Sequence, residues 1–244
     1  MKNTPFIAVT SQPVPYHADT TAIFNTLCQQ NSNSLLLDSA EIGSKNSLQS
    51  LILINAAVKI TCLGNQVTFR ALNANGKQVL KEIHPVLSQL GTVSAVNFDD
   101  EFSVQFAPLD NQLDEDSKLQ AATIFDGLRV ISNHYQHSST PVFLGGLFAY
   151  DLVANFIPMQ GVELKDDGIH CPDYSFYLAE NLITIDHQSQ QATLKSFCFS
   201  QEEQVEVAKT ALSIAQKLKN IDGVLSIKAA SDEVSTNFEA VSYT

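Results

Sequence analysis

The chain has 244 residues, of which 44% are hydrophobic and 16% are charged, and this composition indicates a globular protein rather than a disordered one. The formal net charge is -12 with no cluster of Lys or Arg to offset it, which argues against binding to nucleic acid. No apolar run is long enough to span a membrane and no signal-peptide core follows the N-terminus, so we expect no membrane association and a cytoplasmic location.

The N-terminal segment predicts two helices separated by a short strand. Asp19 can cap a helix whose apolar side chains share one face, namely Ile23, Phe24, Leu27 and Cys28. A strand is expected over residues 34–38, where a short apolar run ends in polar residues. A second helix is predicted over residues 44–53, with an apolar stripe made of Leu48, Leu51 and Ile52.

The pattern then changes to the period of two that is typical of strands. Residues 57–63 and 66–72 alternate on either side of Gly64-Asn65, which is a strong signal for a two-residue hairpin. The segment 73–76 predicts a turn into a third strand near residues 78–83. These successive hairpins indicate an antiparallel sheet.

The middle of the chain predicts one more strand and a long helix. Residues 101–106 alternate like a strand, and the acidic stretch 113–117 indicates a loop or the start of a helix. Apolar residues then recur every three or four positions and predict one buried stripe, which consists of Ala121, Ile124, Phe125, Leu128, Ile131 and Tyr135. His134 and His137 are expected to face solvent, since no carboxylate or Cys pair accompanies them in the sequence.

The C-terminal part predicts two core strands, a hairpin and a helix. Residues 143–150 and 174–186 have the apolar content of core strands, and residues 192–199 complete a hairpin with the second of them. Residues 200–203, Ser-Gln-Glu-Glu, have the pattern of a capping box. The helix that follows is expected to turn five apolar residues inward, namely Val205, Ala208, Leu212, Ala215 and Leu218.

Hairpins combined with separate helices, rather than regular β-α-β units, place the chain in the α+β class. We assign residues 1–220 to one domain and the polar, weakly patterned residues 221–244 to a linker. The cysteines form no C-x-x-C pair, so no metal site is predicted, and buried thiols are expected at Cys28, Cys62, Cys171 and Cys198.

Three short motifs are candidate sites of chemistry. Gly145-Gly146 lacks the spacing of a phosphate-binding loop, and we interpret it as tight packing of a strand under its neighbour. Tyr150-Asp151 is interpreted as a hydrogen-bonded pair at a helix start. Asp186-His187 is interpreted as a turn at a hairpin tip, because a catalytic base needs a dry and oriented setting. No pattern in the chain predicts a catalytic residue.

Asp38-Ser39, at the end of an apolar strand, has two interpretations. The pair can simply cap the strand end. Alternatively, a carboxylate and a hydroxyl at the mouth of an apolar strand can bind an amine, such as the ammonium group of an amino acid. The residues alone favour the first interpretation.

Several segments together resemble component I of anthranilate synthase, in its N-terminal region. The resemblance runs from about residue 21 to residue 199. Five segments in the same order carry it, namely 35–40 (Leu-Leu-Leu-Asp-Ser-Ala), 44–45 (Ser-Lys), 113–116 (Leu-Asp-Glu-Asp), 145–154 (Gly-Gly-Leu-Phe-Ala-Tyr-Asp-Leu-Val-Ala) and 171–188, from Cys-Pro-Asp to Ile-Asp-His-Gln.

The resemblance implies an enzyme that converts chorismate to anthranilate and pyruvate, the first step of tryptophan biosynthesis. It further implies Mg²⁺ and ammonia from a glutamine amidotransferase subunit, with feedback inhibition by L-tryptophan. In this family the magnesium ligands and catalytic groups lie in a C-terminal chorismate-binding domain. We therefore expect no catalytic residue and no metal ligand within this chain, which would be inactive alone.

The resemblance also assigns a regulatory role to the strand end. The family's tryptophan-binding motif falls on Asp38 and Ser39, which makes an effector-binding role the favoured interpretation. The family usually has Glu where Asp38 stands, and a family Lys aligns with Gln49, so the carboxylate is shorter and one cation is replaced. The implied fold has antiparallel sheets packed face to face with outer helices, which agrees with the α+β class.

Two alternatives remain open at this stage. One is a fragment of aminodeoxychorismate synthase component I of folate synthesis, which has a similar glycine-rich strand, although Asp38-Ser39 and residues 177–180 favour the tryptophan enzyme. The other is a free-standing amino-acid-binding regulatory module. A chain without its partner domain would expose apolar surface, so association into homo-oligomers is also expected.

Overall fold

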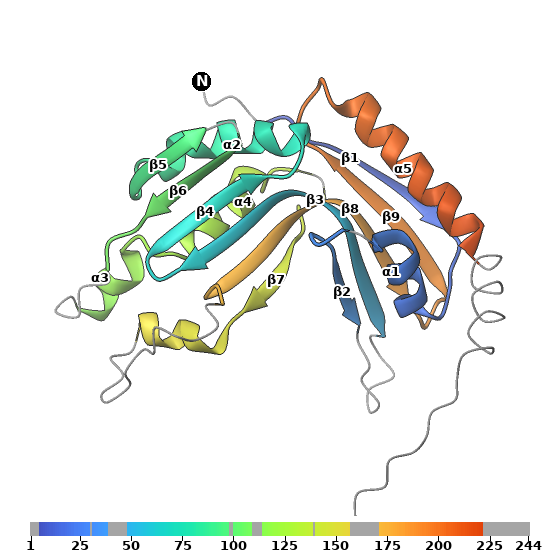
Figure 1. Cartoon of the computed structure of the whole chain (residues 1–244), viewed down its shortest axis with the longest axis horizontal. Helices are drawn as coiled ribbons and strands as arrows, with labels where there is room; N and C mark the ends of the chain where they lie inside the picture. Colours follow the sequence, from blue (N-terminus) through green and yellow to red (C-terminus); the bar gives the residue numbers. More distant parts are fainter. Residues whose placement is uncertain are drawn as a thin grey trace, which may run out of the picture.

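The computed structural model describes residues 5–29, 31–38, 48–97, 100–108, 114–138, 140–156 and 171–221. Within these ranges the strands form one antiparallel sheet in the order β1-β9-β8-β3-β4-β6-β5, with β2 paired to β3 and β7 paired to β8 (Figure 1). The strands are β1 (Ala8–Val14), β2 (Leu35–Asp38), β3 (Gln49–Leu63), β4 (Gln66–Ala71), β5 (Thr92–Asn97), β6 (Glu101–Gln105), β7 (Leu144–Phe148), β8 (Tyr174–Asp186) and β9 (Gln191–Cys198).

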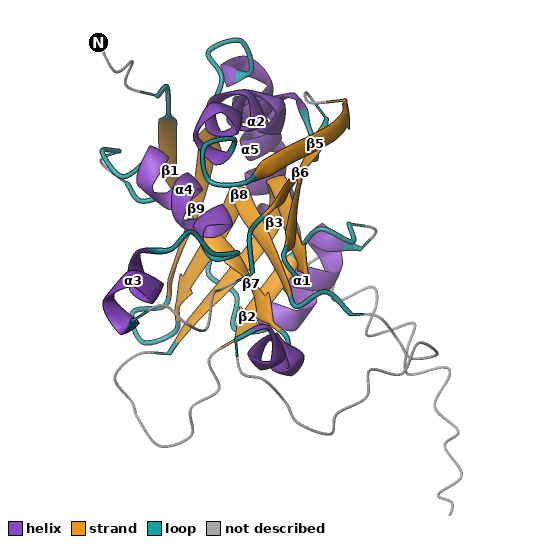
Figure 2. Ribbon diagram, turned by 90° about the vertical axis from the view of Figure 1, so that its left-hand side faces the viewer, coloured by secondary structure: helices purple, strands orange, loops and turns teal. Residues whose placement is uncertain are grey.

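Helices cover both faces of this sheet. They are α1 (Thr20–Cys28), α2 (Ala74–Leu87), α3 (Glu115–Gln120), α4 (Asp126–His134), α5 (Gln204–Lys219) and the short 3-10 helix η1 (Tyr150–Asn155). Neighbouring residues Ile52 and Leu53 of β3 belong to different hydrophobic clusters, so the clusters lie on opposite faces. The Ile52 cluster includes α1 and α5, and the Leu53 cluster includes α2 and α4. In Figure 2, α1 and α4 lie on different sides of the strands.

The α+β class with antiparallel strands is confirmed, but the arrangement of the strands differs from the expected one. We expected separate sheets packed face to face, whereas all described strands belong to one continuous, curled sheet. The reason is the length of β3 and β8, which pair from Gln49–Asp186 to Cys62–Tyr174 and keep the ladder continuous across the molecule. The layers packed against the sheet are helices, not a second sheet.

Several predicted elements appear where the sequence placed them. The Asp19 side chain caps α1 by accepting a hydrogen bond from Ala22 N at 2.8 Å. Gly64, with a φ of +58°, forms the predicted two-residue turn between β3 and β4. β8 has the predicted bounds. Of the cysteines, three are buried as expected, whereas Cys171 is exposed.

Two predictions in the N-terminal half were wrong. The described part of the predicted helix 44–53 is strand, because Leu51 and Ile52 pair with β2 on one side and β8 on the other. The predicted third strand at 78–83 lies inside α2, which Asn73 caps by accepting from Gly76 N at 2.8 Å. A Cβ on Gly76 would lie 1.9 Å from Ala57 O, so this glycine permits close docking of α2 on β3.

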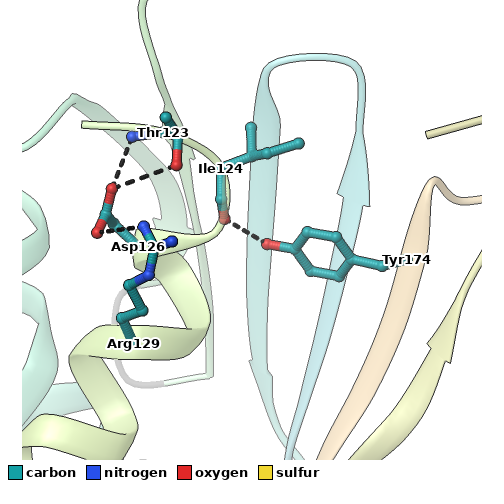
Figure 3. A network of polar contacts seen from close by, with 5 residues as sticks. All are labelled: Thr123, Ile124, Asp126, Arg129 and Tyr174. Atoms are coloured by element: carbon teal, nitrogen blue, oxygen red, sulfur yellow. Dashed lines mark hydrogen bonds and ion pairs between the residues drawn. The ribbon is translucent and has the colours of Figure 1, made fainter. Parts of the chain in front are cut away.

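The long helix predicted after residue 121 is shorter, and α4 starts only at Asp126. As Figure 3 shows, the Asp126 carboxylate reaches back to accept from Thr123 N at 2.7 Å, which fixes the chain before the helix. The buried Tyr174 hydroxyl donates to Ile124 O at 2.7 Å and ties the same segment to β8. The predicted stripe is retained only in part, and His134 is partly buried against Glu82 instead of facing solvent.

The last helix, α5, also differs from its prediction. The predicted capping box is absent among the described contacts, because Glu203 is the N-cap without a side-chain bond and Ser200 Oγ accepts from Glu202 N. Val205 and Leu212, both predicted inward, are 65% and 64% exposed. The buried positions are Val207, Ala211, Ile214 and Leu218. Apolar residues occupy both sides of α5, so the sequence pattern permits two stripes and the contact with β9 selects one.

The buried Glu180 and the partly buried Glu82 have opposite electrostatic settings. Glu180 on β8 is 7% exposed, and its Oε2 accepts from the side-chain amides of Asn73 and Asn75 at 2.9 Å each. Burial nevertheless raises its pKa. Burial also acts to raise the pKa of Glu82 on α2, but hydrogen bonds from His134, Gln78 and Tyr135 outweigh it and lower that pKa.

The α5 register predicts a contrast between two leucines of one helix. Leu218→Ala should lower the free energy of unfolding by about 2–5 kcal/mol, because it empties a site in the buried cluster. Leu212→Ala should change it by less than about 0.5 kcal/mol, because this side chain faces solvent. Urea denaturation followed by circular dichroism measures both. Equal losses would contradict the register described here.

The two glutamates predict opposite pH effects for one substitution. The raised pKa of Glu180 means that its contribution to stability is present below about pH 4.5 and is lost as the pH rises through the folded-state pKa. Glu180→Gln should therefore gain stability over the parent as the pH rises from 4.5 to 8.

Glu82 has a lowered pKa, so its contribution is present above about pH 4.5 and is lost in acid. Glu82→Gln should therefore be less stable than the parent at pH 7, with a difference that shrinks in acid. Denaturation midpoints measured from about pH 3 to about pH 8 test both, and the same sign for the two variants would refute the assignment.

Candidate functional site

Polar side chains gather where β2 ends, β3 begins and the β8–β9 turn starts. Asp38 is the last residue of β2 and lies directly opposite Ser50 of β3, which in turn lies opposite Ile185 of β8. Since residues opposite one another in an antiparallel pair share a face, the Asp38 and Ser50 side chains point to the same side. The turn after β8 is held here by a hydrogen bond from His187 N to Leu48 O at 2.9 Å.

A chain of hydrogen bonds joins five side chains at this place. The Ser50 hydroxyl donates to Asp38 Oδ1, and the same hydroxyl oxygen lies 2.8 Å from His187 Nε2. His187 Nδ1 lies 3.2 Å from the Tyr16 hydroxyl, and the two rings meet edge to face. Thr20, the first residue of α1, donates to the second carboxylate oxygen of Asp38 at 3.2 Å.

The side chains of this hydrogen-bond chain differ in their exposure to solvent. Ser50 is fully buried and Thr20 is 4% exposed, whereas Tyr16 and His187 are half-buried and Asp38 is exposed. Asp38 therefore presents a carboxylate to solvent while protein hydroxyl groups hold both of its oxygens from behind. Such a fixed, exposed carboxylate suits an ammonium group, because charge-assisted hydrogen bonds are among the strongest in proteins.

The order of these residues argues against nucleophilic catalysis. In a catalytic triad the histidine lies between the serine and the carboxylate, so that it can remove the serine proton. Here Ser50 lies between Asp38 and His187, and its hydroxyl is inaccessible to a substrate. The arrangement positions a carboxylate and does not activate a nucleophile.

Asp186 does not join this chain. Its carboxylate accepts from Ser189 N at 3.0 Å and Gln188 N at 2.9 Å, and it closes the β8–β9 turn. The backbone amide of Ser189 is the main reason that the pKa of Asp186 lies below its usual range. The turn interpretation of Asp186 is confirmed, whereas His187 contributes its imidazole to the polar chain.

The other predicted effector residues are placed less directly. Ser39 lies outside the described residues. Gln49 is exposed and precedes Ser50 on β3, so strand alternation directs it to the face opposite the Asp38 side chain. The effector roles of Asp38, Ser39 and Gln49 stay predictions.

The glycine motif has the predicted structural role. Gly145 and Gly146 lie in β7 opposite Tyr177 and Phe176 of β8. A Cβ on Gly146 would lie 2.2 Å from Ser175 O, so only glycine allows this approach of the two strands. Tyr150, at the start of η1, is 89% exposed. The side chain of Asp151 lies outside the described set, so the predicted Tyr150–Asp151 bond stays a prediction.

The Cys-Pro-Asp motif joins two hairpins. Asp173 Oδ2 accepts from Gly64 N at 2.6 Å, and Asp173 N donates to Cys62 O at 2.8 Å. Asp173 O in turn accepts from Ala149 N at 2.8 Å, just after β7. Burial and the nearby Asp173 charge raise the pKa of the Cys62 thiol to about 12, so this thiol stays protonated and unreactive.

An apolar surface lies beside this motif. We call it the β7–η1 surface, and it consists of the exposed side chains of Leu147, Phe148, Tyr150 and Val153. The Phe148 ring packs on Phe176 with centroids 4.8 Å apart, and its outer side remains accessible. An apolar surface of this kind is typical of an interaction site.

Sequence reasoning missed Tyr16, Thr20, Ser50 and His187 as neighbours of Asp38. Their contacts bridge 12 to 171 positions of the chain. The Asp38–Ser50 pairing depends on the β2–β3 register, which the helix prediction for residues 44–53 concealed. A strand prediction there would have placed Ser50 opposite the end of β2.

Across the described residues, no group of three or more His, Cys, Asp or Glu side chains is arranged to hold a metal ion. No helix in that part of the chain has both the length and the apolar content needed to cross a membrane.

Curated relatives match nearly the whole chain but only part of their own length. Anthranilate synthase component 1 of Haemophilus influenzae is 84% identical over 239 residues, which is 98% of this chain and 46% of the relative. The protein of the same name from Vibrio cholerae is 43% identical over 82% of this chain and 38% of its own length. That of Escherichia coli is 36% identical over 80% and 37%. The chain thus spans less than half the length of these relatives.

A family model gives the same indication. The model described as chorismate binding enzyme matches residues 78–240, from within α2 to beyond α5. This match covers more than half of the chain. The chain therefore belongs to the chorismate binding enzyme family.

Proposed function

We propose that this chain is the N-terminal part of an anthranilate synthase component 1. The observation that carries the proposal is the 84% identity to the Haemophilus influenzae protein over 98% of the chain. The relatives named above all carry this enzyme's name, which supports it over the aminodeoxychorismate synthase alternative. The whole protein would convert chorismate and ammonia to anthranilate and pyruvate, in the cytoplasm, as the first step of tryptophan biosynthesis.

Within that enzyme, the described residues would serve as a scaffold and as part of a regulatory site. The polar chain positions a carboxylate and offers no nucleophile, which fits effector binding better than catalysis. Asp38, with Ser39, would bind the ammonium end of L-tryptophan, whereas Gln49 points to the other face of β3. Chorismate chemistry and its Mg²⁺ would be handled by residues outside this chain.

The β7–η1 surface supports the same proposal. Exposed Leu147, Phe148 and Tyr150 form an apolar area of the kind that usually contacts another domain or protein. The rest of the longer protein would cover it, and copies of the isolated chain would associate through it. A glutamine amidotransferase subunit, component II, would supply ammonia to the assembled enzyme.

The proposal predicts that only the full-length protein forms anthranilate. The 244-residue chain should form no anthranilate from chorismate, ammonia and Mg²⁺, whereas the full-length gene product should form it and lose activity when EDTA removes Mg²⁺. Anthranilate fluorescence measures the product. With glutamine in place of ammonia, the full-length protein should need component II. Anthranilate formation by the 244-residue chain alone would overturn the division of roles proposed here.

The second prediction concerns the effector. In the full-length protein, Asp38→Asn should raise the tryptophan concentration for half-inhibition by about 10- to 100-fold, which corresponds to the loss of a charged hydrogen bond of about 1.5–3 kcal/mol. Glu206→Gln on the exposed side of α5 removes the same charge and should leave inhibition unchanged. The isolated chain should bind tryptophan weakly or not at all in calorimetry. Micromolar affinity of that chain, or normal inhibition of the Asn variant, would contradict the assignment.

A further inference from the structure

We propose that His187 is a positioning residue for Asp38, acts through the buried Ser50 hydroxyl, and makes the affinity of this site for an ammonium ligand depend on pH. The inference rests on the effector role proposed above for Asp38. It adds His187, Ser50 and Tyr16 to that role, and its basis is the hydrogen-bond chain and not the family resemblance.

The single hydroxyl proton of Ser50 determines the direction of the hydrogen bonds around it. A serine hydroxyl has one proton and can donate only one hydrogen bond at a time. An ionised carboxylate only accepts, so the Ser50 proton must point to Asp38 Oδ1 for that bond to exist. The 2.8 Å contact with His187 Nε2 is then possible only if Nε2 carries a proton and donates it to Ser50 Oγ.

The second step fixes the other imidazole nitrogen. In a neutral histidine one ring nitrogen is a donor and the other an acceptor. With the proton on Nε2, Nδ1 accepts from the Tyr16 hydroxyl at 3.2 Å. All donors of the chain thus point the same way, from Tyr16 through His187 and Ser50 to Asp38.

This direction has a consequence for the carboxylate. Ser50 and Thr20 each hold one oxygen of Asp38, so the group is oriented without being neutralised. Ser50 is fully buried, and without His187 its hydroxyl would lose the donor that fixes its orientation. His187 thereby helps to position a carboxylate that it does not touch.

The third step is protonation. Histidine is the side chain that ordinarily gains a charge between about pH 5 and 8. Protonated His187 would still donate to Ser50, while Nδ1 would become a donor and Tyr16 would turn its hydroxyl oxygen toward it. The hydrogen bonds to Asp38 would persist. The protonated imidazole of His187 would add a positive charge, separated from the Asp38 carboxylate only by Ser50, and this charge would compete with a ligand ammonium for the carboxylate.

The charged and titratable groups that face His187 are few in the described part of the chain. Asp38 of β2 faces it through Ser50, Tyr16 faces it from the segment between β1 and α1, and Asp186 precedes it in the turn. Asp186 is occupied by the backbone amides of Gln188 and Ser189. β3 contributes only the Leu48 carbonyl and the Ser50 hydroxyl. Among these groups, His187 is the one that is linked to Asp38 through the Ser50 hydroxyl.

The test uses the full-length protein with L-tryptophan as the probe, at pH 8 and at pH 5.5, where the ammonium and carboxylate of tryptophan both stay ionised. The dissociation constant from calorimetry should rise about 3- to 10-fold in acid for the parent. His187→Gln keeps an amide donor for Ser50 and cannot titrate, so it should bind like the parent at pH 8 and show no pH effect. His187→Leu lacks the donor and should bind about 10-fold more weakly at both pH values.

Two further variants separate positioning from general damage. His137→Gln changes an exposed histidine outside the site and should keep the parental pH effect. Ser50→Ala breaks the chain, so adding His187→Leu to it should weaken binding no further, as expected for two residues that act in series. An additional loss in the double variant would show that His187 acts by another route and would overturn the inference.

A spectroscopic measurement needs no ligand. Long-range ¹H–¹⁵N NMR of the imidazole should show His187 protonated at Nε2 and unprotonated at Nδ1 near pH 8. The opposite tautomer would refute the proton direction argued here. If the parent binds no tryptophan at any pH, the effector role fails and this inference fails with it. If the parent binds and His187→Gln retains the pH effect, the inference alone is wrong.

Discussion

The pairing of β3 with β8, and the irregularity within it, determines where everything else in this molecule lies. The register shifts between Leu53 and Val58, so that alternate side chains change face partway along the strand. Before the shift, Ile52 and Ile54 point to the α1–α5 side. After it, Val58 and Ile60 point to the α2–α4 side. One strand pair thereby supplies the cores of both faces.

Two backbone carbonyls beside this irregularity accept hydrogen bonds from surrounding segments. Ile54 O accepts from the Asn31 side chain at 2.6 Å, and Ala57 O accepts from Leu72 N at 2.9 Å. A buried carbonyl without a partner is costly, so these bonds select the positions of the loop before β2 and of the start of α2. Gly76 allows α2 to approach Ala57 closely enough for this docking. Contacts beside the bulge therefore help to position the loop after α1 and the start of α2.

Local signals could predict much of this fold, because their cause lies within a few residues. The Asp19 cap and the Gly64 turn depend on the conformation of neighbouring residues, and both were predicted correctly. The N-terminal end of β3 and the register of α5 depend on distant partners. An apolar run such as Leu51–Ile54 has no period that separates a strand buried on both faces from a helix, so pairing with β2 and β8 decides.

The candidate site likewise combines residues that the sequence could indicate with residues that only distant strand pairings bring together. Asp38 and Ser39 could be selected from the sequence because they match a motif of the family that the chain resembles, whereas Ser50 and His187 become neighbours of Asp38 only through two strand pairings. His187 in particular follows a predicted turn and carries no local sign of a second role. The turn interpretation was correct for the backbone and for Asp186, and it left the imidazole of His187 unexplained.

The two regions of functional interest lie at opposite ends of one strand pair. Asp38 and His187 lie at the Gln49–Asp186 end, and the β7–η1 surface adjoins the Cys62–Tyr174 end. About twelve residues at roughly 3.3 Å each give a path of about 40 Å along the curled strands between these ends, compared with a Debye length of about 8 Å in physiological salt. A charge bound at Asp38 is therefore screened from the β7–η1 surface. Any influence of an effector on that surface therefore has to pass through a change in the structure. The β3–β8 hydrogen bonds constrain the two strands least between Leu53 and Val58, where the register shifts.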